Sequence, residues 1–392
     1  MALDRGARAT RRSVAAVFFV QGFLFASWTA HIPHIKAHLH LGDGGLGVAL
    51  LAAPAGSILA MFVVARLLPT RGSRQLVRGA LVGYCLAGLV VGLSSSMLFF
   101  FLAFLFWGFF LGALDVSMNA QAVSVEAASS RRLMPGFHGS WSLGSLLGAG
   151  AGVIGVGLGW SLSEQIAIFA IPLLIAALGL SRGMITDRHA HAPAGQSAPA
   201  ERSALRNPAI LVLGVIVLLD MLCEGAVADW AAVYLRDSLH TTSVVAGLGF
   251  TLYLLTMMIT RFSGNRTATR FGVPRILPAL ALLAAIGATL GLIVNRPWSV
   301  LAGLMCLGVG LALIVPLAFS ACGHVPRVHA GKAIAAVSGI GYSAYVVGPP
   351  LVGGIADWSS LRTAFFLIPL LIVGIAVATF FSSALRSEAL EI

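Results

Sequence analysis

Charged residues are scarce in this sequence, and acidic residues are the scarcest. Aspartate, glutamate, lysine and arginine make up 10% of the chain, with 25 basic residues against 14 acidic ones. A soluble domain carries about 25% charged residues, so the composition excludes a large water-soluble domain. The mean hydropathy of +0.94 and the 58% share of hydrophobic residues indicate that lipid surrounds most of the chain.

Cysteine is also rare, and the motifs of many enzymes are missing. The four cysteines all fall within apolar runs, as small core residues do, and form no disulfide or zinc-binding pattern. No GxxxxGK[ST] motif is present, so ATP does not drive the protein directly. We therefore expect no enzyme activity, no catalytic residue, no metal site and no cofactor.

Long apolar runs are what the sequence does contain. A helix that crosses a bilayer needs roughly 20 apolar residues, and twelve runs approach or exceed that length. They are 14–34, 46–67, 76–94, 97–124, 136–157, 164–181, 208–235, 244–263, 276–294, 298–320, 333–354 and 362–385. The sequence therefore predicts an all-α membrane protein with twelve transmembrane helices.

Glycines and prolines punctuate these runs. Gly144, Gly148 and Gly152 recur every four residues, a pattern that lets a neighbouring helix approach closely. Pro316 is expected to bend the tenth run, and Pro349 with Pro350 to break the eleventh.

The basic residues are distributed unevenly between the loops. If the N-terminus is cytoplasmic, all but four of the 25 basic residues fall in cytoplasmic segments; the exceptions are Lys36, Arg236, Arg296 and Arg362. This asymmetry follows the positive-inside rule and predicts that both termini are cytoplasmic. It explains the basic excess without nucleic-acid binding. We expect a multi-pass protein of a bacterial cytoplasmic (inner) membrane.

One polar stretch divides the chain into halves. Residues 183–207 are rich in alanine, proline, glycine and serine, so we expect an N-terminal half at 1–182, a cytoplasmic linker at 183–207 and a C-terminal half at 208–392. The halves resemble each other at an offset of 200 residues, with Gly108 matching Gly308. Parallel repeats of this kind are typical of transporters in which one half rocks against the other about a central site.

The fourth and fifth runs carry polar side chains into the membrane. Asp115 and Asn119 lie one helical turn apart, and His138 and Ser142 share a face of the next run, with Trp141 beside them. A carboxylate in a membrane span is a functional-site hypothesis by default. We predict that these five residues line a cavity; the alternative is that Asp115 only anchors helices through hydrogen bonds.

The seventh run carries three acids. Asp220 and Glu224 lie one turn apart, with Asp229 further around the helix. Three carboxylates in one span cannot all be ionised without partners, so we expect at least one to bind and release a proton. These acids and Asp115 are the candidates for proton coupling. The alternative is that one or two of the three pair with arginine.

Further cavity candidates lie in the first and eleventh runs. They are Gln21, Trp28, Thr29, His31, Tyr342 and Tyr345. His31 could relay protons or could be a solvated histidine near the outer membrane interface. The two tyrosines could contact substrate or make hydrogen bonds between helices.

Charged residues at the ends of the runs could form gates. Glu126, at the inner end of the fourth run, could pair with Arg71, Arg131 or Arg132 on the cytoplasmic side. The alternative is an exposed ion pair that contributes under about 1 kcal/mol. Arg261, at the end of the eighth run, is a further gate candidate.

The chain resembles the major facilitator superfamily along its whole length. The loop ARLLPTRGSR (65–74) is similar to the superfamily's G-x-L-x-D-R-x-G-R-R loop, although Pro69 stands where the family has an aspartate. Within the superfamily the chain resembles the MosC/YbjJ-like group, which is related to fucose-type sugar permeases. The segments that carry this resemblance are LDVSMNAQAVSVE (114–126), LMPGFHGSWSLGSLLGAG (133–150) and CEGAVADWAAVYL (223–235).

The resemblance implies a secondary transporter. Sugar-type relatives use an acid of the fourth helix for proton coupling, a position that Asp115 would match. We therefore expect a monomer that moves a small sugar- or polyol-like solute together with protons. The alternatives are a proton-driven exporter of lipophilic or cationic compounds and a membrane sensor that binds a solute without transporting it.

Overall fold

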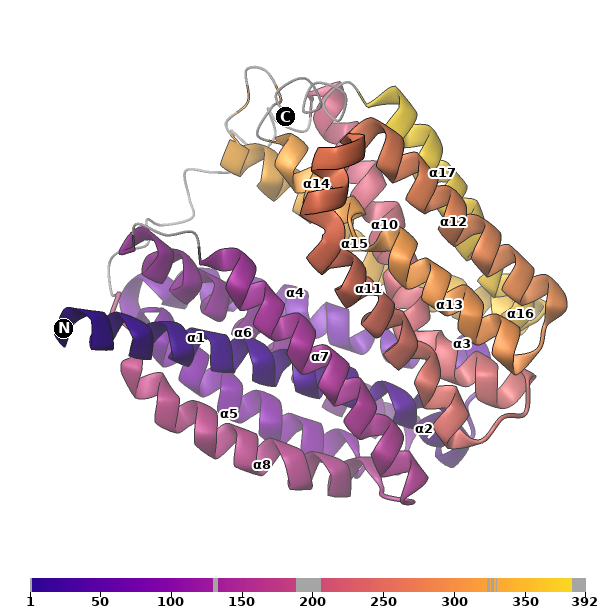
Figure 1. Cartoon of the computed structure of the whole chain (residues 1–392). Coiled ribbons are helices and arrows are strands. Elements are labelled where there is room, and N and C mark those ends of the chain that lie inside the picture. The colour runs from indigo at the N-terminus through magenta and orange to yellow at the C-terminus, as the bar shows by residue number, and fades with distance from the viewer. Residues whose placement is uncertain are drawn as a thin grey trace. The chain divides into compact units, whose positions relative to one another are not determined.

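The computed structural model describes residues 2–129, 133–187, 206–322, 325, 328 and 330–382. The chain divides into two compact units, which are Met1–Leu41 with Val48–Ala194, and Gly42–Gly47 with Gly195–Ile392 (Figure 1). All the regular secondary structure in the described ranges is helical.

The first unit is a bundle of long helices. They are α1 (Ala2–Ser27), η1 (Thr29–His31), α2 (Ile32–His38), α4 (Ala52–Arg71), α5 (Ser73–Val91), α6 (Met97–Ala127), α7 (Met134–Gly157), α8 (Leu162–Leu180) and η2 (Ser181–Gly183), and α3 (Asp43–Leu50) runs into it from the second unit. In this bundle α1 lies against α7 and α6 packs between α4 and α5. Local signals fix where helices begin: the Ser96 side chain accepts from Phe99 N to start α6, and Ser161 and Glu164 form a capping box at α8.

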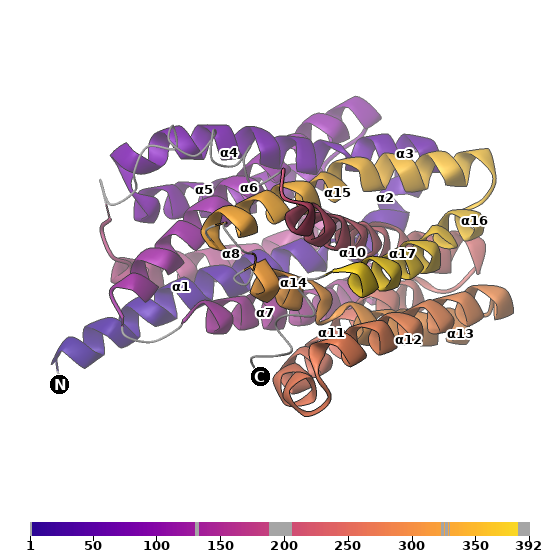
Figure 2. The same ribbon diagram turned by 90° about the horizontal axis from the view of Figure 1, so that it is seen from above.

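Three glycines set the contact between α1 and α7. A side chain at any of them would overlap a backbone carbonyl of α1. The pairs are Gly144 with Phe19, Gly148 with Phe23, and Gly152 with Ser27. The predicted small-residue seam is confirmed, and its neighbour is α1, which Figure 2 shows alongside α7.

The second unit has the same kind of architecture. Its helices are α10 (Pro208–Val233), the π-helical turn η4 (Tyr234–Ser238), α11 (Ser243–Phe271), α12 (Val273–Val294), α13 (Pro297–Leu311), α14 (Ile314–Cys322), α15 (Ala330–Trp358), α16 (Leu361–Phe365) and α17 (Leu367–Phe381). The principal packing pairs are α10 with α15, α12 with α13, α11 with α13, and α12 with α17. Figure 2 shows α12 running beside α13.

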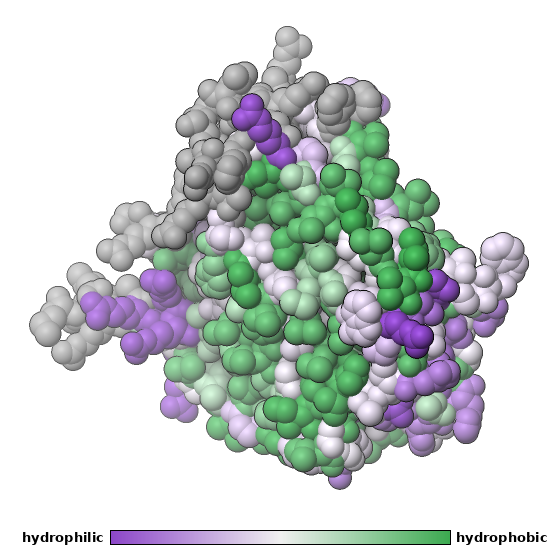
Figure 3. Space-filling view, turned by 45° about the vertical axis from the view of Figure 1, so that its right-hand side comes forward, coloured by the Kyte–Doolittle hydropathy of each residue, from purple (hydrophilic) through white to green (hydrophobic). Residues whose placement is uncertain are grey.

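The helices present an apolar surface to lipid. In the described part of the chain, eleven helices are long and apolar enough to cross a membrane, and α15 carries the remaining apolar run. Large side chains such as Phe262 and Leu98 are 76% and 69% exposed, and Figure 3 shows broad areas of hydrophobic surface. A soluble protein rarely exposes such areas. The predicted all-α membrane fold with twelve transmembrane helices is confirmed.

The prolines act differently from one another. The tenth run is interrupted between α13 and α14, close to Pro316, as predicted. The predicted break in the eleventh run is wrong, because Pro349 and Pro350 lie inside the continuous helix α15. A proline removes a single helical hydrogen bond, and in a membrane span neighbouring helices and local adjustments can satisfy the freed group.

Candidate functional site

Gln21, Asp115, Asn119 and Trp141 form one polar cluster in the first unit. The Trp141 indole Nε1 donates to Gln21 Oε1 at 2.8 Å. Asn119 Nδ2 donates to the carboxyl Oδ1 of Asp115 at 3.3 Å and to its backbone oxygen at 2.9 Å. The Gln21 side chain also lies beside the Asp115 carboxyl, and its Nε2 is 3.5 Å from the backbone oxygen of Leu111, one turn earlier on α6. The structure thus brings together four of the predicted site residues from three helices.

The glycine seam explains why these side chains meet. Gly22, next to Gln21, lies so close to α7 that a side chain there would overlap the carbonyl of Trp141. Close contact of the α1 and α7 backbones leaves the flanking Gln21 and Trp141 side chains within hydrogen-bonding distance. The site geometry therefore depends on small residues that carry no chemistry of their own.

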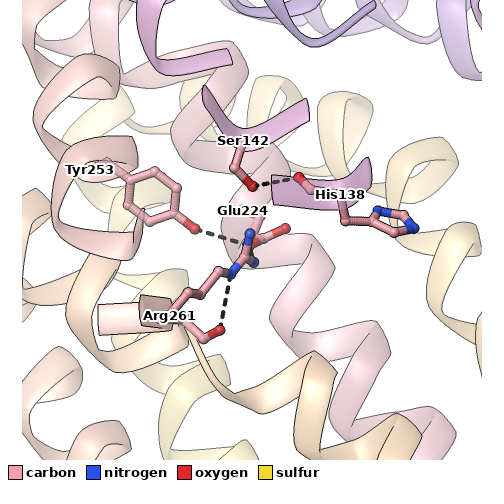
Figure 4. Close-up of polar contacts among 6 residues, drawn as sticks. His138, Ser142, Glu224, Tyr253 and Arg261 are labelled. Carbon is pink, nitrogen blue, oxygen red and sulfur yellow. Dashed lines mark hydrogen bonds and ion pairs between the residues drawn. The ribbon is translucent and has the colours of Figure 1, made fainter. Parts of the chain in front are cut away.

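Two further candidates continue the polar face of α7. Ser142 Oγ donates to the backbone oxygen of His138 at 3.1 Å (Figure 4). The His138 ring packs edge-on against Phe18, with ring centroids 5.4 Å apart. His138 is exposed and Ser142 half-buried within the structure, so both side chains are accessible on the face that also carries Trp141.

The remaining candidates of the first run are buried in packing contacts. Trp28 lies 4.8 Å from the Phe104 ring and 5.6 Å from the Trp107 ring, centroid to centroid. Thr29 Oγ1 donates to the Ala26 carbonyl. These contacts account for both side chains within the unit, and their role in a cavity stays a prediction.

His31 is not a solvated histidine. Its side chain is 2% exposed, and its Nε2 lies 2.9 Å from Gln165 Oε1. Gln165 Nε2 in turn donates to the Ser27 carbonyl at 2.8 Å. Since the amide oxygen of Gln165 is an acceptor, the facing ring nitrogen of His31 carries the hydrogen. The reading of His31 as a solvated histidine is therefore wrong, and its relay role stays a prediction.

The second unit holds a polar cluster around Arg261 that includes Glu224 and Tyr253 (Figure 4). Arg261 Nη2 lies 3.7 Å from Glu224 Oε1, and the Tyr253 hydroxyl donates to the same oxygen at 3.3 Å. Arg261 Nε donates to the backbone oxygen of Ala312 at 3.1 Å. Glu224 is thus paired with an arginine, and its role in proton coupling stays a prediction.

Asp220 has a different environment, although it lies one turn from Glu224. Its side chain is 0% exposed. Among the described residues, neither of its carboxyl oxygens has a hydrogen-bond partner. An isolated buried carboxylate is far more costly than a neutral carboxyl group. Two acids on one helix face thus differ in the support that the protein gives to a negative charge.

The tyrosines of α15 meet the acids of α10. Tyr345 packs against Gly225, where an added Cβ would lie 3.6 Å from the ring. Its hydroxyl interacts electrostatically with Glu224, Asp220 and Asp229. Tyr342 is 43% exposed, with its ring centroid 6.1 Å from that of Tyr345. The structure therefore joins the candidates of the seventh and eleventh runs in one cluster.

Glu126 caps a helix. Its Oε2 accepts hydrogen bonds from Leu133 N at 2.5 Å and Met134 N at 2.8 Å, at the start of α7. A carboxylate at a helix N-terminus satisfies free N–H groups and favours the helix dipole. Arg71 is the last residue of α4, while Arg131 and Arg132 lie outside the described residues. The gate roles of these residues stay predictions.

Asp187 is a buried acid that the sequence analysis missed. It lies in the stretch expected to be a linker, yet it is 6% exposed. Oδ1 accepts from Ser73 N at 2.8 Å, and Oδ2 accepts from Ser73 Oγ at 2.6 Å and Ser124 Oγ at 3.1 Å. Asp187 therefore fixes the first residue of α5 to α6. One signal for this acid was present in the sequence. Pro69 stands where the superfamily's loop has an aspartate, so the loop before α5 lacks that acid.

Comparisons with known proteins agree with this architecture. A sequence model of the Major Facilitator Superfamily matches residues 213–390. An uncharacterized MFS-type transporter of Yersinia pestis is 30% identical over 368 residues, which are 93% of this chain and 94% of the relative. The membrane protein MosC of Rhizobium meliloti is 31% identical over 383 residues, 97% of this chain and 92% of MosC.

A solved structure shares the fold. A point mutant of the nucleoside transporter NupG superposes with a TM-score of 0.77 at 12% sequence identity. The match covers 95% of this chain and 100% of the NupG chain. At this identity the similarity concerns the arrangement of the helices and carries no information on the solute.

Proposed function

This chain belongs to the major facilitator superfamily, in its MosC-like group, and on that premise we propose that it moves a small polar, sugar- or polyol-like solute together with protons. The family is one of membrane-embedded secondary transporters and not of enzymes. We propose a rocker-switch cycle, in which the two halves alternately open the solute site to the two sides of the membrane. The further parts of the proposal are the class of the solute, the coupling to protons, and the residues that bind the solute and the proton.

The contrast between Asp220 and Glu224 carries the proton proposal. Arg261 and Tyr253 support a negative charge on Glu224, whereas Asp220 is buried without a hydrogen-bond partner among the described residues. Adjacent acids in such different environments take different protonation states. In the proposal Glu224 is the carboxylate paired with Arg261, and Asp220 carries the proton until the site opens to water.

Asp115 is the second proposed proton site. Its partners Gln21 and Asn119 are neutral amides, so no fixed charge holds it in one protonation state. An acid that changes its proton between conformations needs this freedom. We assign the proton that accompanies the solute to Asp115. We assign the charge pairing with Arg261 to the acids of α10.

The other polar groups suit a solute that carries hydroxyls. Gln21, Asn119 and Ser142 are uncharged donors and acceptors, and Trp141 adds a flat apolar face beside them. Hydroxyl groups of a sugar or polyol can both donate and accept, and a ring face can stack on an indole. Basic residues that follow the positive-inside rule support a bacterial cytoplasmic membrane with both termini inside, and we propose a monomer.

A binding screen and an exchange assay test the proposal. The purified protein is screened by thermal shift at pH 5.5 and 7.5 against sugars, polyols and amino sugars, with lipophilic cations in parallel. A ligand at 100 times its dissociation constant stabilises the protein by about 2.7 kcal/mol. Each hit is then assayed by counterflow in proteoliposomes, with and without an imposed pH gradient.

The outcomes separate the candidate functions. A polar hit that exchanges across the membrane and accumulates with the pH gradient supports the proposal. Hits confined to lipophilic cations indicate a proton-driven exporter. The excess of three acids, Asp220, Glu224 and Asp229, over the arginine Arg261 favours this reading. Binding without exchange indicates a sensor.

A further inference from the structure

The hydrogen bond from Trp141 determines which way the Gln21 amide points. An indole N–H is only a donor, and it lies 2.8 Å from Gln21 Oε1. Amide oxygen and nitrogen are assigned from their partners, and this partner requires the oxygen. The Gln21 NH₂ group therefore points the other way, toward the Leu111 carbonyl at 3.5 Å and the Asp115 carboxyl.

Asp115 consequently faces two amide groups that both donate. Gln21 reaches it from α1 and Asn119 from α6. The helices packed against α6 are α1, α4, α5 and α7. In the described part these helices carry Asp4 and arginines on α1, arginines on α4, Tyr84, Cys85 and arginines on α5, and His138 on α7.

This arrangement favours an ionised carboxylate over a protonated carboxyl group. A carboxylate accepts from both amides, but a protonated carboxyl must donate its O–H to an acceptor. The Asn119 amide cannot turn freely, because its NH₂ also donates to the Asp115 backbone oxygen at 2.9 Å. Among the described residues, the Gln21 NH₂ has one long 3.5 Å contact to the Leu111 carbonyl besides Asp115. Gln21 is therefore the amide that can turn.

Turning Gln21 breaks its bond to Trp141. Its oxygen would accept from the protonated Asp115, and its NH₂ would face the indole N–H, donor against donor. We propose that Gln21 is a positioning residue that ties the proton on Asp115 to the Trp141 side chain: the indole is held while Asp115 is ionised and released when Asp115 is protonated. This inference rests on the proposed function of Asp115 as a proton site.

Release of the Trp141 side chain would change the proposed solute site. The indole is half-buried on α7, with the Phe25 ring 6.0 Å away and Ser142 next in sequence. A change of one hydrogen bond at Gln21 thus alters the aromatic face that the solute is proposed to meet. Proton binding and solute binding become linked through one amide.

The test titrates the Asp115 carboxyl directly and needs no solute. The infrared C=O stretch of the protonated carboxyl is followed against pH in the protein reconstituted in lipid, and the Asp115 band is assigned by its loss in Asp115→Asn. Trp141→Phe keeps an aromatic ring against Phe25 but removes the donor. Protonation then no longer requires a broken bond, so the midpoint should move up by about half to one pH unit.

Matched variants separate a local effect from a general one. Trp107→Phe removes an indole N–H that has no partner among the described residues, and should leave the midpoint unchanged. In a Gln21→Met background, Trp141→Phe should have no additional effect, since the two residues act through one bond.

Two failures are distinguishable. If Asp115→Asn removes no titrating band, Asp115 is not a proton site, and the proposed proton role fails together with this inference. If the band exists but its pH midpoint in Trp141→Phe equals the midpoint in Trp107→Phe, only the link through Gln21 is overturned. If Trp141→Phe does not fold, Gln21→Met tests the same link.

Discussion

Arg261 donates from Nε to the backbone oxygen of Ala312 at 3.1 Å. In a continuous helix this carbonyl would accept from the residue four positions later, which is Pro316 and has no N–H. The interruption between α13 and α14 thus leaves a buried acceptor, and the arginine that pairs with Glu224 occupies it. The proline bend and the acid cluster are parts of one arrangement.

Pro316→Ala should uncouple these parts. The new N–H competes with Arg261 for the Ala312 carbonyl, so we expect counterflow to fall roughly tenfold, as for one lost hydrogen bond to a charged group. Thermal stability should hold or rise, because proline inside a helix costs about 3 kcal/mol. Pro278→Ala, inside α12, is the control and should leave transport intact. Equal loss in both variants would contradict the link.

The two acids of α10 should respond differently to neutral substitution. Asp220→Asn removes the proposed proton carrier but no described hydrogen bond, so accumulation driven by a pH gradient should disappear while the unfolding temperature stays near wild type. Glu224→Gln leaves the Arg261 charge unpaired and should cost roughly 1–2 kcal/mol. Unfolding curves and pH-driven uptake measure both effects. Normal accumulation by Asp220→Asn would remove it from the proton path.

Helices and their small-residue seams were predictable from the sequence because each depends on local composition. Lipid as solvent makes long apolar runs into helices, and a glycine every fourth residue marks a close neighbour. The pairing of Asp115 with Asn119 also follows from helical periodicity. These features need no knowledge of which helix lies beside which.

Partners that come from distant segments were beyond sequence reasoning. Nothing in the pattern indicates that Trp141 donates to Gln21 or that Arg261 reaches Ala312, since both contacts depend on helix packing. Asp187 is a further case: its surroundings in sequence are polar, and only the folded unit shows that it is buried. Burial is a property of the assembled bundle.

Asp187 should stabilise the first unit. Asp187→Ala removes the acceptor for Ser73 N and one of two acceptors near each of the Ser73 and Ser124 hydroxyls, in a largely buried setting, so we expect a loss of about 2 kcal/mol. Asp237→Asn, an exposed acid in η4, is the comparison and should change stability by under about 0.5 kcal/mol. Thermal unfolding in detergent measures both. Equal stability of the two variants would show that the Asp187 contacts contribute nothing net.

The α1–α7 seam gives a prediction with a control on the same helix. At Gly148 a methyl group would overlap the Phe23 carbonyl, whereas at Gly150 nothing lies within 4 Å of an added Cβ. Alanine favours a helix over glycine by about 1 kcal/mol, so Gly150→Ala should be neutral or stabilising. Gly148→Ala must separate the two helices, and we expect a loss of roughly 1–3 kcal/mol.

The same variant tests whether the seam holds the site together. Separation of α1 from α7 lengthens the contact between Trp141 and Gln21, so Gly148→Ala should raise the pH midpoint of the Asp115 infrared band, in the same direction as Trp141→Phe. Gly150→Ala should leave it in place. If Gly148→Ala loses stability but keeps the wild-type midpoint, the seam supports the fold without setting the geometry around Asp115.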